Sequence, residues 1–316
     1  MSLVSIVKGN NFQDGIERSS ITFIVDRDQD GDPYFSLAQE YYLTDEKNQT
    51  DYVVDDCKSL ECILESLTRL SKNNSTPWGK INIVVHGNPW TGLSLYTTEC
   101  SENRTMTQSI ITELVNGNLP TLDKWIIDDE SVIEFIACGL GQNEVLIEAL
   151  RMAFVGWSKA PAEVLSSSFF INFFRHEDGH VERRNLEPHY AFYRTAYRPA
   201  NLHIAEQLTQ RYPQKSIDWM SSIDKNEWQD RSEVFSKRFN VPVDWRVSLT
   251  ASSHYEWNTE SDKIDFISDQ KDLVEVLEAY SIPIEKFRWN ISKEKNYIHI
   301  KGKATVLCIL QEMTVS

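Results

Sequence analysis

Two stretches of the chain decide its fold: Ile81-Asn82-Ile83-Val84-Val85-His86-Gly87 and Val132-Ile133-Glu134-Phe135-Ile136-Ala137-Cys138-Gly139. Each begins with a short apolar run, rich in β-branched residues, of the kind that forms a buried strand of a parallel sheet. Each run ends in a side chain able to do chemistry, followed by glycine. Because parallel strands bring their carboxyl ends to one edge of a sheet, we expect His86 and Cys138 to lie at the same edge.

The surrounding segments alternate between strand and helix. Further strands are predicted at 21–25, at 51–54 and within 162–174, and helices at 33–43, 59–70, 105–115 and 143–154. Strands that alternate with helices through short loops form a mainly parallel sheet with helices on both faces. The sequence therefore predicts an α/β domain over residues 1–200.

From Pro199 onward the pattern changes to a polar stretch with widely spaced tryptophans. Strands are predicted at Asp244–Leu249, Lys263–Ile267, Tyr297–Ile300 and Ala304–Leu310, and a helix at Asp272–Tyr280. This pattern indicates a small α+β region over residues 201–316, either appended to the sheet or extending it. We expect this region to bind a partner or a substrate.

The charge of the chain argues against two classes of partner. Its 316 residues carry 32 Lys and Arg against 47 Asp and Glu, a formal net charge of -15, which repels nucleic acid and anionic membranes. No apolar run approaches the ~20 residues that a bilayer span requires, and the first residues lack the apolar segment of a secretory signal. We therefore expect a cytoplasmic protein that binds neither nucleic acid nor membrane.

The cysteines are consistent with that compartment. There are five, an odd number without metal-type spacing: Cys57, Cys62, Cys100, Cys138 and Cys308. We expect their thiols to stay reduced, with one of them reactive, and we expect Cys62 to lie on the apolar face of a helix.

His86 and Cys138 suit nucleophilic catalysis. A thiol attacks a carbonyl well only as the thiolate, and a neighbouring imidazole can take its proton and later protonate the leaving amine. The glycines that follow both residues leave room for a substrate backbone, and the N–H groups of Gly87 and Cys138 would stabilise the oxyanion of a tetrahedral intermediate. Either residue alone more often has a structural role; their shared pattern favours a catalytic dyad.

The two motifs resemble those of the caspase–hemoglobinase group of cysteine peptidases, clan CD. In that group, one hydrophobic strand ends in His-Gly and the next ends in a small residue followed by Cys, as in Val85-His86-Gly87 and Ala137-Cys138-Gly139 here. The resemblance covers about residues 20–175. It implies that His86 is the general base and acid, that Cys138 is the nucleophile, and that Gly87 donates to the oxyanion.

The chain departs from caspases in two ways. Ile136 replaces the glutamine that precedes the caspase Ala-Cys pair, which argues against aspartate specificity, and a helix predicted from Asn143 replaces the processed linker. The closer likeness is to single-chain members such as the CHAT and clostripain-like groups. Many members of the clan act in cell death or defence, so the resemblance implies a role of that kind.

An acidic loop follows the strand at 21–25. Its carboxylates, Asp26 and Asp28 above all, are expected at the same sheet edge, where they would favour a basic residue before the scissile bond. The loop also resembles the start of an EF-hand, but Leu37 stands where the bidentate glutamate belongs. We therefore predict no metal or other cofactor, with calcium as the disfavoured alternative.

The segment His176-Glu177-Asp178-Gly179-His180 invites a metal interpretation that we do not favour. Gly179 opposes a helix and no third ligand follows at fixed spacing, so we predict a polar turn.

Taken together, the sequence predicts a cysteine endopeptidase that cleaves a protein substrate and is controlled by an activating protein partner. The alternative is a catalytically degenerate relative that keeps the fold as a scaffold or binding module, and the reactivity of Cys138 distinguishes the two.

Overall fold

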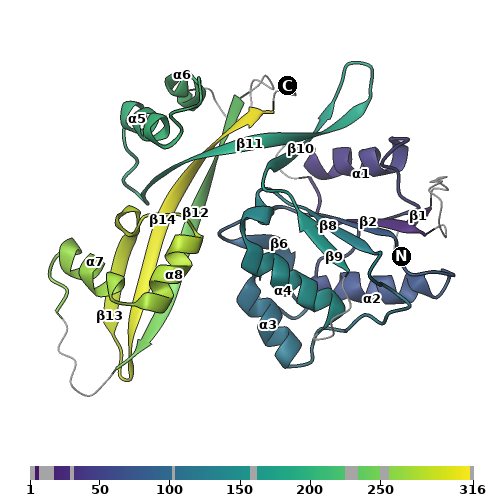
Figure 1. Ribbon diagram of the computed structural model, residues 1–316, viewed down its shortest axis with the longest axis horizontal. Coiled ribbons are helices and arrows are strands. Elements are labelled where there is room, and N and C mark those ends of the chain that lie inside the picture. Colours follow the sequence, from purple (N-terminus) through teal and green to yellow (C-terminus); the bar gives the residue numbers. More distant parts are fainter. Residues whose placement is uncertain are drawn as a thin grey trace. The chain divides into compact units, whose positions relative to one another are not determined.

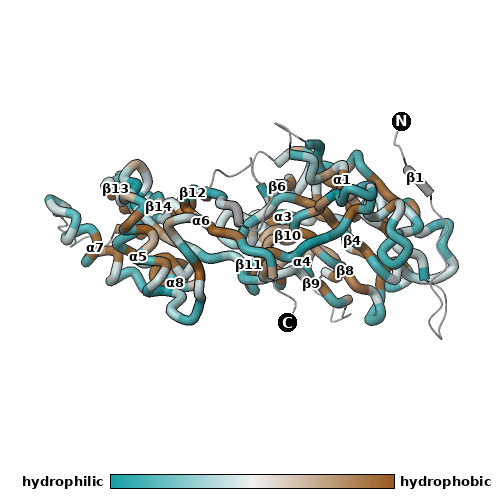
Figure 2. Tube along the Cα trace, turned by 90° about the horizontal axis from the view of Figure 1, so that it is seen from above, coloured by the Kyte–Doolittle hydropathy of each residue, from teal (hydrophilic) through white to brown (hydrophobic). Residues whose placement is uncertain are grey.

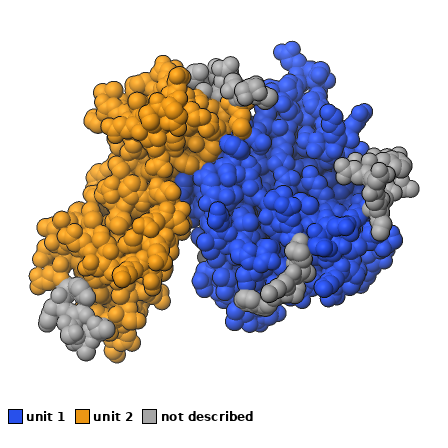
Figure 3. Space-filling model, viewed as in Figure 1, with its two compact units in different colours: residues 1–186 blue, residues 187–316 orange. Residues whose placement is uncertain are grey.

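The computed structural model describes residues 4–6, 18–28, 32–101, 104–156, 162–224, 234–249 and 256–313. The chain forms two compact units, Met1–Leu186 and Glu187–Ser316, which Figure 3 colours separately. The sequence placed the division at residue 200, whereas the structure divides inside strand β11 (Val181–Arg194).

The first unit is built on a six-stranded sheet in the order β1-β3-β2-β4-β8-β9. Its strands are β1 (Val4–Ile6), β2 (Ser20–Ile24), β3 (Tyr52–Val54), β4 (Lys80–Val84), β8 (Val132–Ile136) and β9 (Glu163–Ser166). The five strands from β3 to β9 are parallel, and β1 pairs with β3 in the antiparallel sense. The predicted α/β architecture is confirmed.

Helices cover both faces of this sheet (Figure 1). Helix α1 (Tyr34–Thr44) packs on one face, and α2 (Leu60–Ser71), α3 (Thr107–Val115) and α4 (Glu144–Val155) pack on the other. Hydrophobic residues run along β4 and β8 (Figure 2), and they enter the cores on both faces of the sheet. Among the described residues, no helix is both long and apolar enough to cross a bilayer.

Local sequence explains where these helices begin and end. The Ser59 side chain accepts the amide of Cys62 and so caps α2, whose apolar residues then recur every three or four positions and enter the core. Asn143 caps α4 in the same way, and Gly156, with a φ of 63°, ends it.

Two small elements surround the carboxyl edge of the sheet. A three-stranded sheet, β5 (Gly87–Asn88), β6 (Gly92–Tyr96) and β7 (Arg104–Thr105), directly follows His86, and a 3-10 turn, η1 (Leu140–Gln142), follows Cys138. Strand β10 (Phe170–Arg175) pairs with the start of β11 as an antiparallel hairpin. Residues 162–174 thus hold two strands where one was predicted, and His176–His180 form the predicted turn between β10 and β11.

The second unit is an antiparallel sheet with helices. Strand β14 (Tyr297–Glu312) lies between β11 and β12 (Val234–Ser248) and also pairs with β13 (Arg288–Lys293). The helical elements are α5 (Asn201–Arg211), α6 (Trp219–Asp224), α7 (Glu260–Ser268), α8 (Lys271–Ala279) and the 3-10 turn η2 (Ile284–Lys286). The α+β class and the helix at Asp272–Tyr280 are confirmed.

One prediction in this unit was wrong, and two predicted strands are joined into one. Lys263–Ile267 is helical, within α7, because Thr259 and Asp262 form a capping box that starts a helix there. Tyr297–Ile300 and Ala304–Leu310 are strand, as predicted, but they are parts of one strand, because Gly302 between them is a site of close packing. A Cβ at Gly302 would lie 2.3 Å from the Trp289 ring, so the glycine lets the ring cross β14 without breaking it.

His189 gives this unit a pH-dependent stability. It lies on β11, is only 1% exposed and packs edge-on against Tyr212 and Trp219. Burial lowers the pKa of His189, which the charge of Glu187 opposes and that of Lys215 reinforces. The unfolded chain therefore binds more protons than the native chain, so stability falls as the pH drops below the unfolded value of about 6.5.

We expect His189→Leu to remove part of this pH dependence. The measurement is the free energy of unfolding in urea at pH 7.5 and at pH 5, for the wild type and the variant. His203→Leu, an exposed position on α5, is the matched control and should keep the full dependence. An unchanged dependence in His189→Leu would contradict the assignment.

Candidate active site

Strand register brings three of the predicted residues to equivalent positions on neighbouring strands. Ile24 of β2, Val84 of β4 and Ile136 of β8 are in register across three neighbouring parallel strands. Pairing continues one residue further, because the Val25 amide donates to the Val84 carbonyl at 3.1 Å and the Val85 amide donates to the Ile136 carbonyl at 3.2 Å. Asp26, His86 and Cys138 each come two residues after these in-register positions, in a row along the carboxyl edge.

The His86 and Cys138 side chains belong to the same face of the sheet. Val84 and Ile136 pack in the core under α1, whereas Val85 and Ala137 pack in the core on the opposite face. Side chains alternate along a strand, so the next residue on each strand returns to the α1 face. The contacts of both residues agree with this assignment.

His86 packs against the first turn of α1. Its ring stacks on Tyr34 with centroids 4.7 Å apart and meets the Phe35 ring edge-on at 4.6 Å. Tyr34 donates its hydroxyl hydrogen to the Ile136 carbonyl at 3.2 Å. Burial raises the pKa of Tyr34 well above its usual value, and the charge of a Cys138 thiolate would raise it further. Tyr34 therefore stays a neutral donor beside the two residues.

Cys138 is buried, with 6% of its surface exposed. Its thiol donates to the carbonyl oxygen of Ile171, on β10, over 3.7 Å. The chain then turns sharply at Gly139, which has a φ of 65° and whose amide donates to the Phe169 carbonyl at 3.0 Å. The Gly139 amide therefore already has a hydrogen-bond acceptor. Gly141 packs closely against the chain, since a Cβ there would lie 2.3 Å from the Ser166 carbonyl oxygen.

Gly87, the predicted oxyanion donor, lies next to the Cys138 strand end. It pairs with Leu93 in the small sheet, and a Cβ at this position would lie 3.4 Å from that of Ala137. The carbonyl of His86 accepts a hydrogen bond from the Ser94 amide at 2.7 Å. This bond fixes the backbone between His86 and Ser94.

The two acidic candidates have different surroundings. Asp26 accepts the amide of Arg27 at 2.9 Å and is partly buried. Asp28 accepts the amides of Phe35, at 2.7 Å, and Ser36, at 3.2 Å, and so holds the amino end of α1. Asp30 and Gly31, which complete the EF-hand-like pattern, lie outside the described residues.

Comparison with protein-family models, with curated proteins and with solved structures finds no match to this chain.

The prediction that all five cysteines are reduced is wrong. Cys57 and Cys62 form a disulfide, whereas the sequence predicted reduced thiols throughout; Cys100, Cys138 and Cys308 are not part of a disulfide. A spacing of five residues does not by itself indicate a bond. The loop that returns the chain from β3 to the amino end of α2 brings the two Cα atoms to 5.4 Å, within the usual range for a disulfide.

Proposed function

We propose that the chain is a cysteine endopeptidase in which His86 activates the thiol of Cys138, as the resemblance to the caspase–hemoglobinase group implies. One observation carries the proposal: the strand register places the two residues at equivalent positions on neighbouring parallel strands, on the same face of the sheet. In the reaction, His86 takes the thiol proton, sulfur attacks the scissile carbonyl, and His86 protonates the leaving amine. Water then hydrolyses the thioester.

The surroundings of Cys138 support control of this chemistry. The thiol is buried and donates to the Ile171 carbonyl, so its proton is directed toward β10. Activation in this proposal moves the β10 segment away from Cys138, which releases the thiol and opens the cleft. An activating protein partner bound to the second unit or to the β10–β11 hairpin would supply the energy for that movement.

Asp26 supports the proposed preference for a basic residue. It comes two residues after the last residue of β2, as His86 does after β4, and the two strands are neighbours in register. A carboxylate there would attract the Lys or Arg side chain that precedes the scissile bond. Asp28 is the weaker candidate for this role, because it already holds two amides of α1.

A degenerate scaffold is the second candidate function. The low exposure of Cys138 and its hydrogen bond to the Ile171 carbonyl also favour this candidate. A thiol that is permanently buried cannot react with a protein substrate. In that case the second unit would hold a partner and no bond would be cleaved.

The test uses a Cys100→Ser background, which removes the exposed free thiol. Peptides ending in Arg, Lys, Asp or Leu are offered to the protein and to its Cys138→Ala variant, with and without calcium. We expect cleavage after Arg or Lys by the first protein only. A peptidyl chloromethyl ketone ending in Arg should also label Cys138 at least about tenfold faster than Cys308. No cleavage, together with equally slow labelling of both cysteines, would favour the scaffold.

A further inference from the structure

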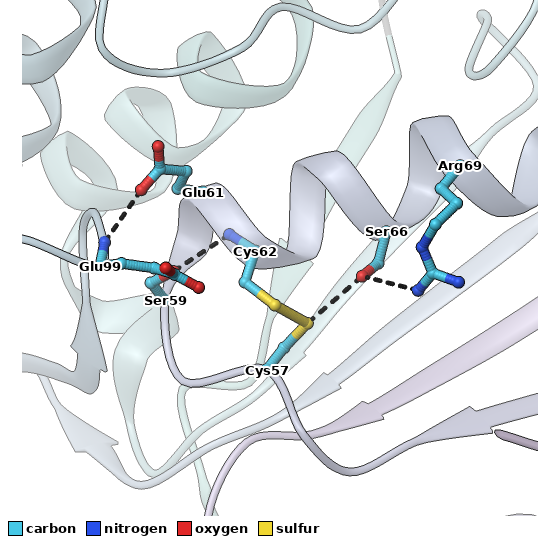
Figure 4. The surroundings of a disulfide bond; sticks show 7 residues. All are labelled: Cys57, Ser59, Glu61, Cys62, Ser66, Arg69 and Glu99. Atoms are coloured by element: carbon cyan, nitrogen blue, oxygen red, sulfur yellow. Dashed lines mark hydrogen bonds between the residues drawn. A yellow bond between two sulfur atoms is a disulfide. The ribbon is translucent and has the colours of Figure 1, made fainter. Parts of the chain in front are cut away.

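The disulfide lies in a part of the first unit that the proposed active site does not use. Cys57 belongs to the core on the α2 side of the sheet, whereas His86 and Cys138 face α1. Figure 4 shows its surroundings, with Ser66 and Arg69 on the helix that follows. Any chemistry at this disulfide is therefore independent of the catalytic proposal.

The two sulfur atoms differ in access. Cys57 is 1% exposed, whereas Cys62 is partly exposed and lines a hollow of about 420 Å³ on the surface of α2. The hollow is also lined by Glu65, Ser66, Thr68, Arg69, Lys72 and Pro120. A small molecule in this hollow can reach Cys62 but not Cys57.

The charged side chains of the hollow favour an anion. Among the described residues that line the hollow, Arg69 and Lys72 are exposed cations and Glu65 is the one acid, so the lining carries a small net positive charge, while Glu61 and Glu99 lie near the disulfide outside this lining (Figure 4). Attraction of this kind raises the local concentration and the encounter rate of an oppositely charged reactant.

A chain of hydrogen bonds leads to the buried sulfur. Arg69 donates from its guanidinium to Ser66 Oγ at 3.4 Å, and the Ser66 hydroxyl lies 3.5 Å from Cys57 Sγ (Figure 4). The disulfide sulfur carries no hydrogen, so the hydroxyl is the donor. A thiolate formed on Cys57 would therefore be stabilised by a hydroxyl that a positive charge polarises.

We propose that Cys57–Cys62 is a redox-active disulfide that exchanges with a small anionic thiol of the glutathione class. The thiolate of this reactant attacks Cys62 Sγ, the bond between Cys62 and Cys57 breaks, and its electron pair passes to Cys57 Sγ, which then takes a proton from water. The product is a mixed disulfide on Cys62 and a free thiol on Cys57. A second small thiol attacks the small-molecule sulfur, releases the Cys62 thiol and leaves as the oxidised dimer.

The first experiment counts thiols. The full chain, kept without added thiol or disulfide reagents, is denatured and alkylated, and its peptides are mapped by mass spectrometry. We expect three alkylated cysteines, Cys100, Cys138 and Cys308, and five after reduction. Alkylation of Cys57 and Cys62 before reduction would overturn the proposal.

The second experiment compares three small thiols: reduced glutathione, which is anionic, 2-mercaptoethanol, which is neutral, and cysteamine, which is cationic. The rate of disulfide opening is measured at low salt and corrected for the thiolate fraction of each reagent. We expect glutathione to be fastest, cysteamine slowest, and the adduct to form on Cys62. Equal corrected rates, or an adduct on Cys57, would overturn the proposal.

Two variants distinguish the effect of the charge on the incoming thiol from the stabilisation of Cys57 as the leaving group. Lys72→Glu should slow glutathione about tenfold and accelerate cysteamine, whereas Lys47→Glu, the same change at an exposed position that does not line the hollow, should alter neither rate more than about twofold. Ser66→Ala should slow all three reagents alike, by about fivefold, because it removes the donor to Cys57. An unchanged glutathione rate in Lys72→Glu contradicts the proposed ligand, and unchanged rates in Ser66→Ala contradict the proposed leaving group.

Discussion

His86→Asn and Cys138→Ser are each expected to lower kcat/KM for a cleaved peptide by at least about a thousandfold. General acid–base catalysis by a positioned side chain contributes about 10² to 10⁴ in rate, and a hydroxyl without its base is a poor nucleophile at neutral pH. Because the two residues act as one unit, the double variant should lose no more than the worse single variant. The measurement is steady-state kinetics on the peptide that the wild type prefers.

A matched control distinguishes catalysis from structure. His86 stacks on Tyr34, so asparagine at this position also removes a ring contact that contributes about 0.5 to 1.5 kcal/mol. His86→Phe keeps the ring and removes the nitrogen atoms; it should retain most of the stability and lose the activity equally. Full activity in His86→Phe would show that His86 only packs against α1.

Arg183→Met is expected to lower the free energy of unfolding by about 2 to 3 kcal/mol, just below the loss of about 3 to 5 kcal/mol for breaking a fully buried ion pair. Arg183, on the part of β11 in the first unit, contacts Glu134 Oε1 at 2.6 Å, and both side chains are only 20% exposed. Without Arg183, the Glu134 carboxylate still has Lys80 as an ion-pair partner. Lys80 is 3.6 Å away and is more exposed than Arg183. The loss is measured by urea unfolding at pH 7.

The contribution of Glu134 to the pH dependence of stability should reverse in sign in this variant. Burial acts to raise the pKa of Glu134, but Arg183, with a smaller contribution from Lys80, outweighs it and holds the pKa below its usual value. In the wild type, this stabilisation is present above the unfolded value of about 4.3 and is lost as the pH falls through the native pKa. With Arg183 absent, we expect burial to dominate and to raise the native pKa of Glu134, so the difference in stability between the wild type and Arg183→Met should shrink as the pH falls.

Two further variants test the ion pair. Arg184→Met removes the neighbouring arginine, whose partner Glu182 is 44% exposed, and should cost less than about 1 kcal/mol. Arg183→Met combined with Glu134→Met should recover much of the loss, since no buried charge is left without a partner. A loss in the double variant that equals the sum of the two single losses would contradict this account.

The first unit could be predicted from its sequence because its strands are buried on both faces. Runs such as Ile81–Val85 and Val132–Ile136 are continuous and apolar, and the residues after them mark the functional edge. The strands β5, β6 and β7 were missed, because they are short and their pairing depends on the turn around Gly92. No pattern in the sequence indicated the ion pair between Glu134 and Arg183, because the two residues lie 49 positions apart.

The second unit was harder to predict because its long strands mix polar and apolar residues. Strand β14 holds Lys301 and Lys303 on either side of Gly302, a pattern that is typical of a turn, yet Trp289 packs over the glycine and the strand continues. In α7, Ile264 and Phe266 alternate as in a strand, but the capping box at Thr259 determines the outcome. Both differences from the prediction arose because tertiary packing or a cap overrides a local pattern.

The order of strands in the parallel sheet also determines when the candidate site forms during synthesis. Ile24 pairs with Val84, and Val84 with Ile136, so each partner is separated by more than fifty residues of intervening chain. Closing such long loops costs entropy before any pairing compensates for it, which makes assembly of the sheet a late step of folding. A nascent chain released from the ribosome before β8 carries His86 without Cys138. A chain that has completed the first unit holds the full row of Asp26, His86 and Cys138 before its second unit has been made.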